Sequence, residues 1–184
     1  KLWCDYIYLD TDERRRFAQV SHEYLIEQVQ EQNISSSGDL NFNHPVKELI
    51  MTQQEKVPLA PGDTSTGSLN NNIQLKLNGH DRFAARDYRY FTRTQVWQHH
   101  NGAGGLTAHA DGATGTPKQG QHDDSIAVYS FALKPEEHQP SGTCNFSRID
   151  NAQLSSTGNT NVCFAVNYNV LRIMSGMGGL AYSN

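Results

Sequence analysis

Alternating apolar and polar residues predict β-strands along most of the chain. Within residues 71–79, single polar residues separate Ile73, Leu75 and Leu77. This period of two places the apolar side chains on one face of a half-buried strand. The segment 126–133 is apolar at nearly every position, which is typical of a strand covered on both faces. With the aromatic and β-branched runs elsewhere, the pattern predicts about eight strands, near residues 2–9, 21–31, 44–53, 71–79, 88–97, 125–133, 142–155 and 161–174.

Helical signals are few and short. Asp10 and Glu13 have the spacing of a capping box, in which the first residue accepts a hydrogen bond from the backbone of the second. We expect a short helix there, with Phe17 packed against the core. Pro135 suits the first position of a helix, so residues 134–137 predict one further helical turn.

The strand pattern predicts an all-β fold, an eight-stranded antiparallel jelly-roll sandwich with short helices in its connections. The more even strand spacing and the Cys-Trp-Cys arrangement of immunoglobulin domains are missing. A length of 184 residues suits one domain. The connection from residue 99 to 124 contains six glycines. It exceeds the roughly 12–15 residues at which irregular loops become uncommon, so we expect it to be functional or mobile.

Charge and cysteine content argue against several classes of protein. The formal net charge is −4, whereas nucleic-acid-binding proteins usually carry a basic face. Cys4, Cys144 and Cys163 are odd in number and lack a Cys-x-x-Cys pair, so we expect buried thiols rather than disulfides or a zinc site. No apolar stretch approaches the roughly 20 residues of a membrane-spanning helix. The chain starts inside a strand-like run, which favours a preceding portion.

Histidines are the natural candidates for metal chemistry. A metal-dependent jelly-roll enzyme of the cupin type would need two histidines on one face of a strand. His99 and His100 are adjacent, and in a strand they would point to opposite faces. We therefore expect solvated loop histidines, with no metal, no other cofactor and no catalytic residue. The candidates weighed for a metal site are His99, His100, His109, His122, Asp111, Asp123 and Asp124.

Two charged clusters are candidate assembly contacts. The first is Arg14, Arg15 and Arg16, because arginine is favoured in protein interfaces; a solvated face or an acidic or phosphate partner are the alternatives. The second is Glu136, Glu137 and His138, which could also suggest acid–base work, although no nucleophile follows at a useful spacing. Asn33 and Asn145 begin Asn-x-Ser sequons and are weak candidates for glycosylation.

Five blocks, in order along the chain, resemble the major capsid proteins of nucleocytoplasmic large DNA viruses, a group that includes phycodnaviruses, iridoviruses and giant viruses. The longest block is SFALKPEEHQPSGTCNFSRID, at residues 130–150. The others are YIYLDTDERRRFAQ at 6–19, NHPVKELI at 43–50, NGHDRF at 78–83 and NYNVLRIMSGMGGLAYSN at 167–184.

This resemblance implies that residues 1–184 are the C-terminal roll of a double jelly-roll protein whose N-terminal roll is absent. Such a protein is structural, not an enzyme. Three copies form a pseudo-hexagonal capsomer of an icosahedral shell, assembled in the host cytoplasm. The implied partners are its own copies and minor capsid proteins. A membrane lies beneath the shell without insertion of the protein, and nucleic acid is not contacted directly.

The chain departs from the family at one connection, and one alternative function stays open. The connection 99–124 is longer than expected for the family, and we expect it at the outer surface of the virion. The alternative function is a carbohydrate-binding jelly roll, lectin-like or receptor-binding, for which residues 70–72 (three asparagines) and Trp97 are the nearest candidates.

Overall fold

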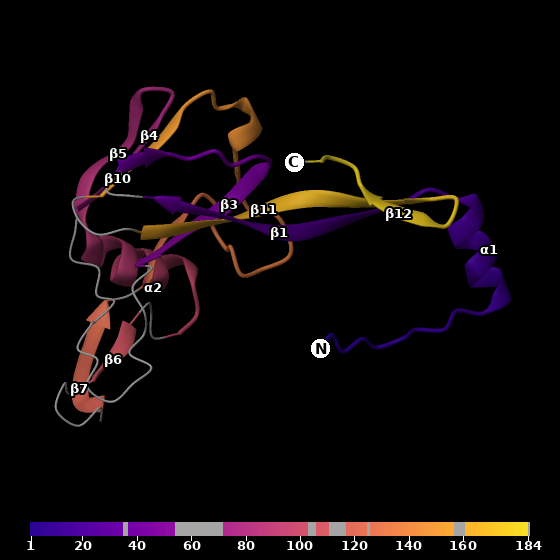
Figure 1. Cartoon of the computed structure of the whole chain (residues 1–184), viewed down its shortest axis with the longest axis horizontal. Helices are drawn as coiled ribbons and strands as arrows, with labels where there is room; N and C mark the ends of the chain where they lie inside the picture. Colours follow the sequence, from indigo (N-terminus) through magenta and orange to yellow (C-terminus); the bar gives the residue numbers. More distant parts are fainter. Residues whose placement is uncertain are drawn as a thin grey trace. The chain divides into compact units, whose positions relative to one another are not determined.

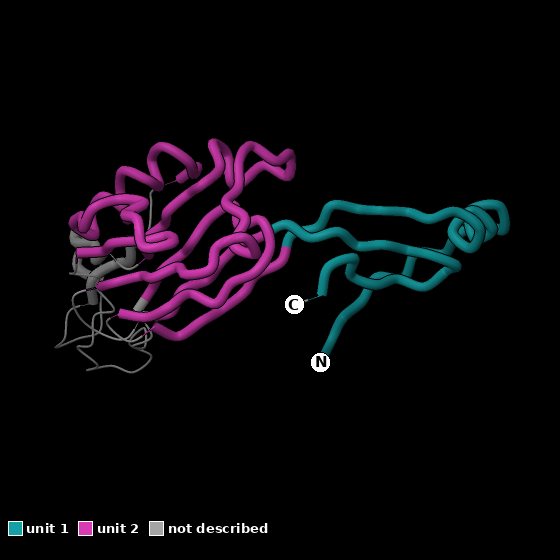
Figure 2. The backbone as a smooth tube through the Cα atoms, turned by 90° about the horizontal axis from the view of Figure 1, so that it is seen from above, with its two compact units in different colours: residues 1–27, 168–184 teal, residues 28–167 magenta. Residues whose placement is uncertain are grey.

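The computed structural model describes residues 1–34, 37–53, 72–102, 106–110, 117–124, 126–156 and 161–183. The chain divides into two compact units, coloured separately in Figure 2. Unit 1 comprises residues 1–27 and 168–184, and unit 2 comprises residues 28–167.

Strands dominate the described part of the chain (Figure 1). The helical elements are α1 (Thr11–Gln19), the π-helical turn η1 (Tyr90–Thr94), α2 (Gln95–His99) and the 3-10 turn η2 (Phe146–Arg148). The strands are β1 (His22–Ile34), β2 (Ser37–Asp39), β3 (Pro45–Gln53), β4 (Asn72–Leu77), β5 (His80–Asp87), β6 (Leu106–Ala110), β7 (Pro117–Asp124), β8 (Ile126–Ser130), β9 (Cys144–Asn145), β10 (Ala152–Ser156), β11 (Asn161–Met174) and β12 (Met177–Leu180).

Two antiparallel sheets form the body of the fold. In the larger sheet the strand order is β1-β11-β3-β8, with β12 paired to β11 and β9 paired to β3. The smaller sheet has the order β2-β10-β4-β5. Neighbours run antiparallel in the pairs β11–β3, β3–β8, β10–β4 and β4–β5. The predicted antiparallel jelly-roll fold is confirmed.

The hydrophobic core lies in unit 2. Leu49 on β3 and Leu75 on β4 come from the two sheets, and both are fully buried. Phe91 of η1 joins the same cluster, with its ring 5.1 Å from that of Phe83 and 6.5 Å from that of Tyr129, measured between centroids. Aromatic groups bury large apolar areas, so these rings stabilise the sandwich against its helical cover.

The strand predicted at 88–97 is wrong, because η1 and α2 occupy it. Burial follows a helical stripe at Phe91, Thr92, Gln95 and Val96. Four of the other predictions also need correction. Residues 2–9 form no strand, and 142–155 contains two strands separated by η2. The segment 126–133 is largely buried, but the strand predicted at 125–133 is shorter, because β8 ends at Ser130, and it lies at the end of the path of its sheet. The turn 134–137 is not helical.

Short turns account for two strands that the pattern missed. Asn78 and Gly79 both have positive φ, of 51° and 78°, and they join β4 to β5 in a tight hairpin. The left-handed conformation suits Asn and Gly. Ser175 and Gly176, with φ of 52° and 76°, join β11 to β12 in the same way.

The glycine-rich connection contains a hairpin, not only irregular chain. Strand β6 pairs antiparallel with β7, with Leu106 opposite Asp124 and Ala110 opposite Pro117. Residues 103–105, 111–116 and 125 lie outside the described part, as do 35–36, 54–71, 157–160 and 184.

Unit 1 contains α1 and the β11–β12 hairpin. Asp10 caps α1, and its Oδ1 accepts a hydrogen bond of 2.9 Å from the Glu13 backbone N–H, as predicted. Phe17 packs against the His22 ring at a centroid distance of 4.6 Å instead of a core, because no residue of α1 is buried. None of the helices in the described residues is long and apolar enough to cross a membrane.

Candidate assembly surfaces and a binding pocket

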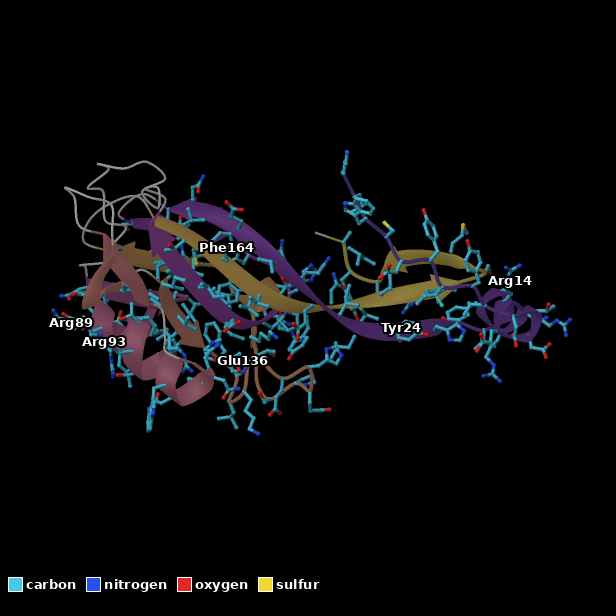
Figure 3. The ribbon with its side chains drawn as sticks, turned by 90° about the horizontal axis from the view of Figure 1, so that it is seen from below. Arg14, Tyr24, Arg89, Arg93, Glu136 and Phe164 are labelled. Carbon is cyan, nitrogen blue, oxygen red and sulfur yellow. The ribbon has the colours of Figure 1, made fainter. Side chains whose placement is uncertain are left out.

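The arginine cluster lies on an exposed helix. Arg14 of α1 is labelled in Figure 3. Arg15 forms an ion pair with Asp12 at 3.9 Å, but both side chains are largely exposed. Such surface pairs contribute little stability. The three arginines therefore remain available to a partner.

Large apolar side chains are also exposed in unit 1. The segment before α1 has no regular secondary structure, yet Trp3 is 89% exposed and Tyr6 is 80% exposed. Ile7 and Tyr8 are each 85% exposed. The end of the chain adds Met177 at 75%. Exposed apolar side chains that gather in one part of a protein can indicate a site of protein contact, so unit 1 is a candidate assembly surface.

Glu136 is held firmly by the end of α2. Its Oε1 accepts hydrogen bonds from the Asn101 backbone N–H at 3.0 Å and from His100 Nδ1 at 3.1 Å. Its Oε2 accepts a third from Asn101 Nδ2 at 2.7 Å. These hydrogen bonds, led by the backbone N–H, lower the pKa of Glu136 because they favour the carboxylate. Glu136 is labelled in Figure 3 on the chain that follows β8.

His100 also faces a buried carboxylate. Its Nε2 lies 2.9 Å from Glu48 Oε2 on β3, and neither atom has a regular hydrogen bond elsewhere among the described residues. Burial raises the pKa of Glu48, although His100 and Lys47 partly oppose the shift. The imidazole thus bridges β3 to the turn at Glu136. The expectation that His100 is solvated is wrong.

A pocket opens beside this bridge in unit 2. Its volume is about 270 Å³. Trp97 and Leu133 supply its apolar part and are 82% and 73% exposed. The polar lining comes from Gln98, His99, His100, Asn101, Lys134, Glu136 and Glu137. The prediction of a solvated loop histidine is wrong for His99 as well. It ends α2, and its Nδ1 lies 3.0 Å from the carbonyl oxygen of Leu133.

The remaining site candidates are scattered. The two predicted assembly clusters lie in different units. His138 is exposed and has further contacts. Asn33 and Asn145 are exposed, and the Asn145 side chain caps η2 by accepting from the Ser147 backbone N–H at 3.1 Å.

Most of the candidate metal ligands lie outside the described side chains, whereas the three cysteines lie within them. Within the described residues, no three His, Cys, Asp or Glu side chains gather as metal ligands; Asp111 and the side chains of His109, His122, Asp123 and Asp124 lie outside them. The three cysteines are free. Cys163 is buried, which raises its pKa to about 12. Cys4 is exposed, so the expectation of burial fails there.

A second basic surface was missed by the sequence analysis, which gave weight only to the adjacent arginines. The guanidinium carbon of Arg86 lies 4.5 Å from the centre of the Tyr90 ring, and that of Arg89 lies 5.2 Å from the Tyr88 ring. Arg89 and Arg93 are labelled in Figure 3. Arg86 lies on β5, whereas Arg89 and Arg93 lie at the start and within η1; a spacing of four residues is the sequence signal for two side chains on one helical face.

The chain matches the family described as large eukaryotic DNA virus major capsid protein over residues 13–179. It is 54% identical to the major capsid protein of Pyramimonas orientalis virus and 38% identical to that of Paramecium bursaria Chlorella virus 1. Both alignments cover 100% of this chain, but only 48% and 54% of the relatives.

A solved structure agrees. The quasi-atomic model of the PBCV-1 virus capsid superimposes with a TM-score of 0.70 at 35% identity, covering 97% of this chain and 56% of that chain. The chain therefore spans about half the length of the relatives that it matches.

Proposed function

Because this chain belongs to the large eukaryotic DNA virus major capsid protein family, we propose that it forms part of a subunit that self-assembles into an icosahedral virus shell. Its role is structural and involves no catalysis. Three subunits form a pseudo-hexagonal capsomer, and this chain supplies the C-terminal roll of a double jelly-roll subunit. That it spans about half of its relatives supports the last point.

The apolar surface of unit 1 carries the proposal. Trp3, Tyr6 and Ile7 are almost fully exposed in this chain, and each would bury a large apolar area if other protein covered it. Burial of apolar surface is the main driving force of protein association. A shell protein needs such surface, because the shell forms when copies of the protein bury apolar area against one another and against the rest of their own chains.

The charged helix α1 would orient the partner at this contact. Arg14, Arg15 and Arg16 project from a helix without buried residues, and complementary charges set orientation and rate in protein association more than they set affinity. The turn at 136–138 supports assembly indirectly, because the Glu136 hydrogen bonds fix its shape.

The other partners follow from the same proposal. Minor capsid proteins join neighbouring capsomers, and the connection containing β6 and β7 faces the outside of the virion. A membrane lies beneath the shell, and assembly takes place in the host cytoplasm. The net charge of −4 supports the absence of direct nucleic-acid contact.

Charge reversal on α1 tests the proposal. We expect the full-length protein to sediment as a trimer and Arg15→Glu to shift it toward monomer, because the reversed charge repels the complementary surface. Arg15→Lys, the matched control, should retain the trimer. Circular dichroism should be unchanged, because the Arg15–Asp12 pair is exposed and contributes roughly 0–1 kcal/mol. Trimers of normal stability for Arg15→Glu would refute the role of α1, and a monomeric native protein would refute self-assembly.

A further inference from the structure

We propose that the pocket at Trp97 binds one uncharged sugar ring of a glycan, a function beyond assembly of the shell. The pocket of about 270 Å³ combines an aromatic ring with hydrogen-bonding side chains from α2 and from the turn after β8. Trp97 is one of the candidates that the sequence suggested for carbohydrate binding. Of the other candidates, residues 70–72, only Asn72 lies in the described part, on β4, and it does not line the pocket.

Trp97 supplies the apolar face of the site. Its side chain is 82% exposed, although the preceding residues of the same helix, Gln95 and Val96, are buried. An indole exposed at the wall of a pocket offers a flat apolar surface with a donor at its edge. The C–H face of a pyranose ring is flat and weakly apolar, so it can stack there while its hydroxyl groups point toward the polar lining.

Glu136 is the preorganised part of the polar lining, because hydrogen bonds from His100 and Asn101 fix it. Glu137 accepts a hydrogen bond of 3.0 Å from Lys134 Nζ, but both side chains are largely exposed and the pair holds them only weakly. A carboxylate can accept about four hydrogen bonds, so both groups retain acceptor capacity for hydroxyl donors. Side chains already held in place lose little conformational entropy when a ligand binds.

His99 adds a directed acceptor. Its Nδ1 faces the carbonyl oxygen of Leu133 at 3.0 Å. A carbonyl can only accept, so Nδ1 carries the proton, and in the neutral ring Nε2 then presents a lone pair. A sugar hydroxyl can donate to this nitrogen and accept from Lys134, which matches the dual hydrogen-bonding character of hydroxyl groups.

Charge pairing favours an uncharged ligand over a basic side chain. Lys134 forms an ion pair with Glu137, and the Glu136 carboxylate already accepts hydrogen bonds from His100 and Asn101. A lysine or arginine from a partner would have to displace these contacts. A polyhydroxyl ligand can use the paired groups as they stand. The volume lies just below the roughly 300–1,000 Å³ typical of small-molecule pockets, which restricts the site to one ring.

A glycan array tests the proposal with the full-length protein. The array carries neutral, sialylated and sulfated glycans, and an arginine-rich peptide is added as competitor. We expect binding to at least one neutral glycan, reduced about tenfold or more by Trp97→Ala. Trp97→Phe should restore part of the binding, because stacking survives. Val29→Ala is the control, since Val29 is exposed in unit 2 but does not line the pocket; it should leave binding unchanged.

Circular dichroism should be the same for all variants, because the substituted side chains are exposed. The proposal is overturned if the native protein retains no neutral glycan or retains only charged ones. Equal binding by Trp97→Ala, or displacement of the glycan by the arginine-rich peptide, overturns it as well. Trimer formation is measured separately, so loss of the sugar site would leave the assembly function standing.

Discussion

Units 1 and 2 handle apolar side chains in opposite ways. The buried hydrophobic cluster, which includes Leu49, Leu75 and Phe91, lies wholly in unit 2. Most of the exposed large apolar side chains of the described residues lie in unit 1, including Trp3 and Ile7. Unit 2 therefore has an internal source of stability, whereas unit 1 has exposed apolar side chains that the proposed assembly would cover.

The difference indicates a division of work within one short chain. A closed core gives a sandwich of fixed shape, because well-packed interiors tolerate little rearrangement. An exposed apolar surface favours association with other protein, because burying it there lowers the free energy. In unit 2, exposed apolar groups such as Trp97 are fewer, and Trp97 lies in a pocket with many polar side chains, which suits a ligand better than a broad protein contact.

Truncation of an aromatic side chain should separate the units most strongly. We expect Phe91→Ala to lower the free energy of unfolding by about 3–5 kcal/mol, because the ring is fully buried against Phe83 and Tyr129. Ile7→Ala in unit 1 should change it by less than about 0.5 kcal/mol. Urea denaturation of this chain measures both. Similar losses from the two substitutions would show that unit 1 has a core of its own.

Glycine substitution should give the next largest contrast. A Cβ at Gly142 would lie 2.7 Å from the Phe131 carbonyl oxygen, and φ there is 145°. We expect Gly142→Ala to lower the free energy of unfolding by more than about 2 kcal/mol. Gly176 also has positive φ, of 76°, but a Cβ there meets nothing within 4 Å, so Gly176→Ala should cost about 1 kcal/mol. Thermal denaturation compares them, and equal costs would contradict the role assigned to packing in unit 2.

The smallest expected effect is a pH dependence inside unit 2. Burial raises the pKa of Glu48 above its ordinary value of 4.5. As pH rises above 4.5, the unfolded chain releases this proton first and the folded chain holds it longer, so this group makes the free energy of unfolding fall with rising pH. We expect Glu48→Gln to remove that fall. Its measurement is urea denaturation at a series of pH values from 4 to 7, roughly spanning the range in which carboxyl groups and histidine titrate.

Glu136→Gln is the matched control, because the pKa of Glu136 is lowered. Its contribution is present above 4.5 and is lost as pH falls through the folded pKa, so its removal should act in the opposite direction. His100 faces both carboxylates and Lys47 faces Glu48, and both residues are retained in the two variants. Identical pH profiles for the two variants would contradict the account of the bridge.

Local pattern was enough to predict much of the sandwich. Strands β3 and β11 lie where the pattern predicted strands, β4 follows its apolar periodicity, and Asp10 caps α1 as its spacing to Glu13 indicates. The segment 88–97 failed because aromatic and β-branched residues favour strands locally, while packing of Phe91 against β8 selects a helix. Tertiary contacts commonly override such preferences.

The pocket was harder to predict, because its parts are distant in sequence. Glu136 was a candidate, but its partners His100 and Asn101 lie 36 and 35 residues away. Adjacent histidines on a loop or strand would be solvated or point to opposite faces, whereas His99 ends a helix and His100 caps it. Glu48 was not predicted, because a single acid in an apolar strand meets its partner, His100, only when the sheet and the end of α2 pack together.

Hydroxyl-radical footprinting of the assembled capsid tests the central claim most directly. Trp3 and Tyr6 are as exposed in this chain as Trp97, and tryptophan and tyrosine are both oxidised rapidly when solvent reaches them. If unit 1 is covered in the shell, Trp3 and Tyr6 should be strongly protected in the particle, while Trp97 reacts as an exposed indole. Oxidation of Trp3 and Tyr6 at the rates of freely exposed side chains in the intact particle would contradict the claim that unit 1 is an assembly surface.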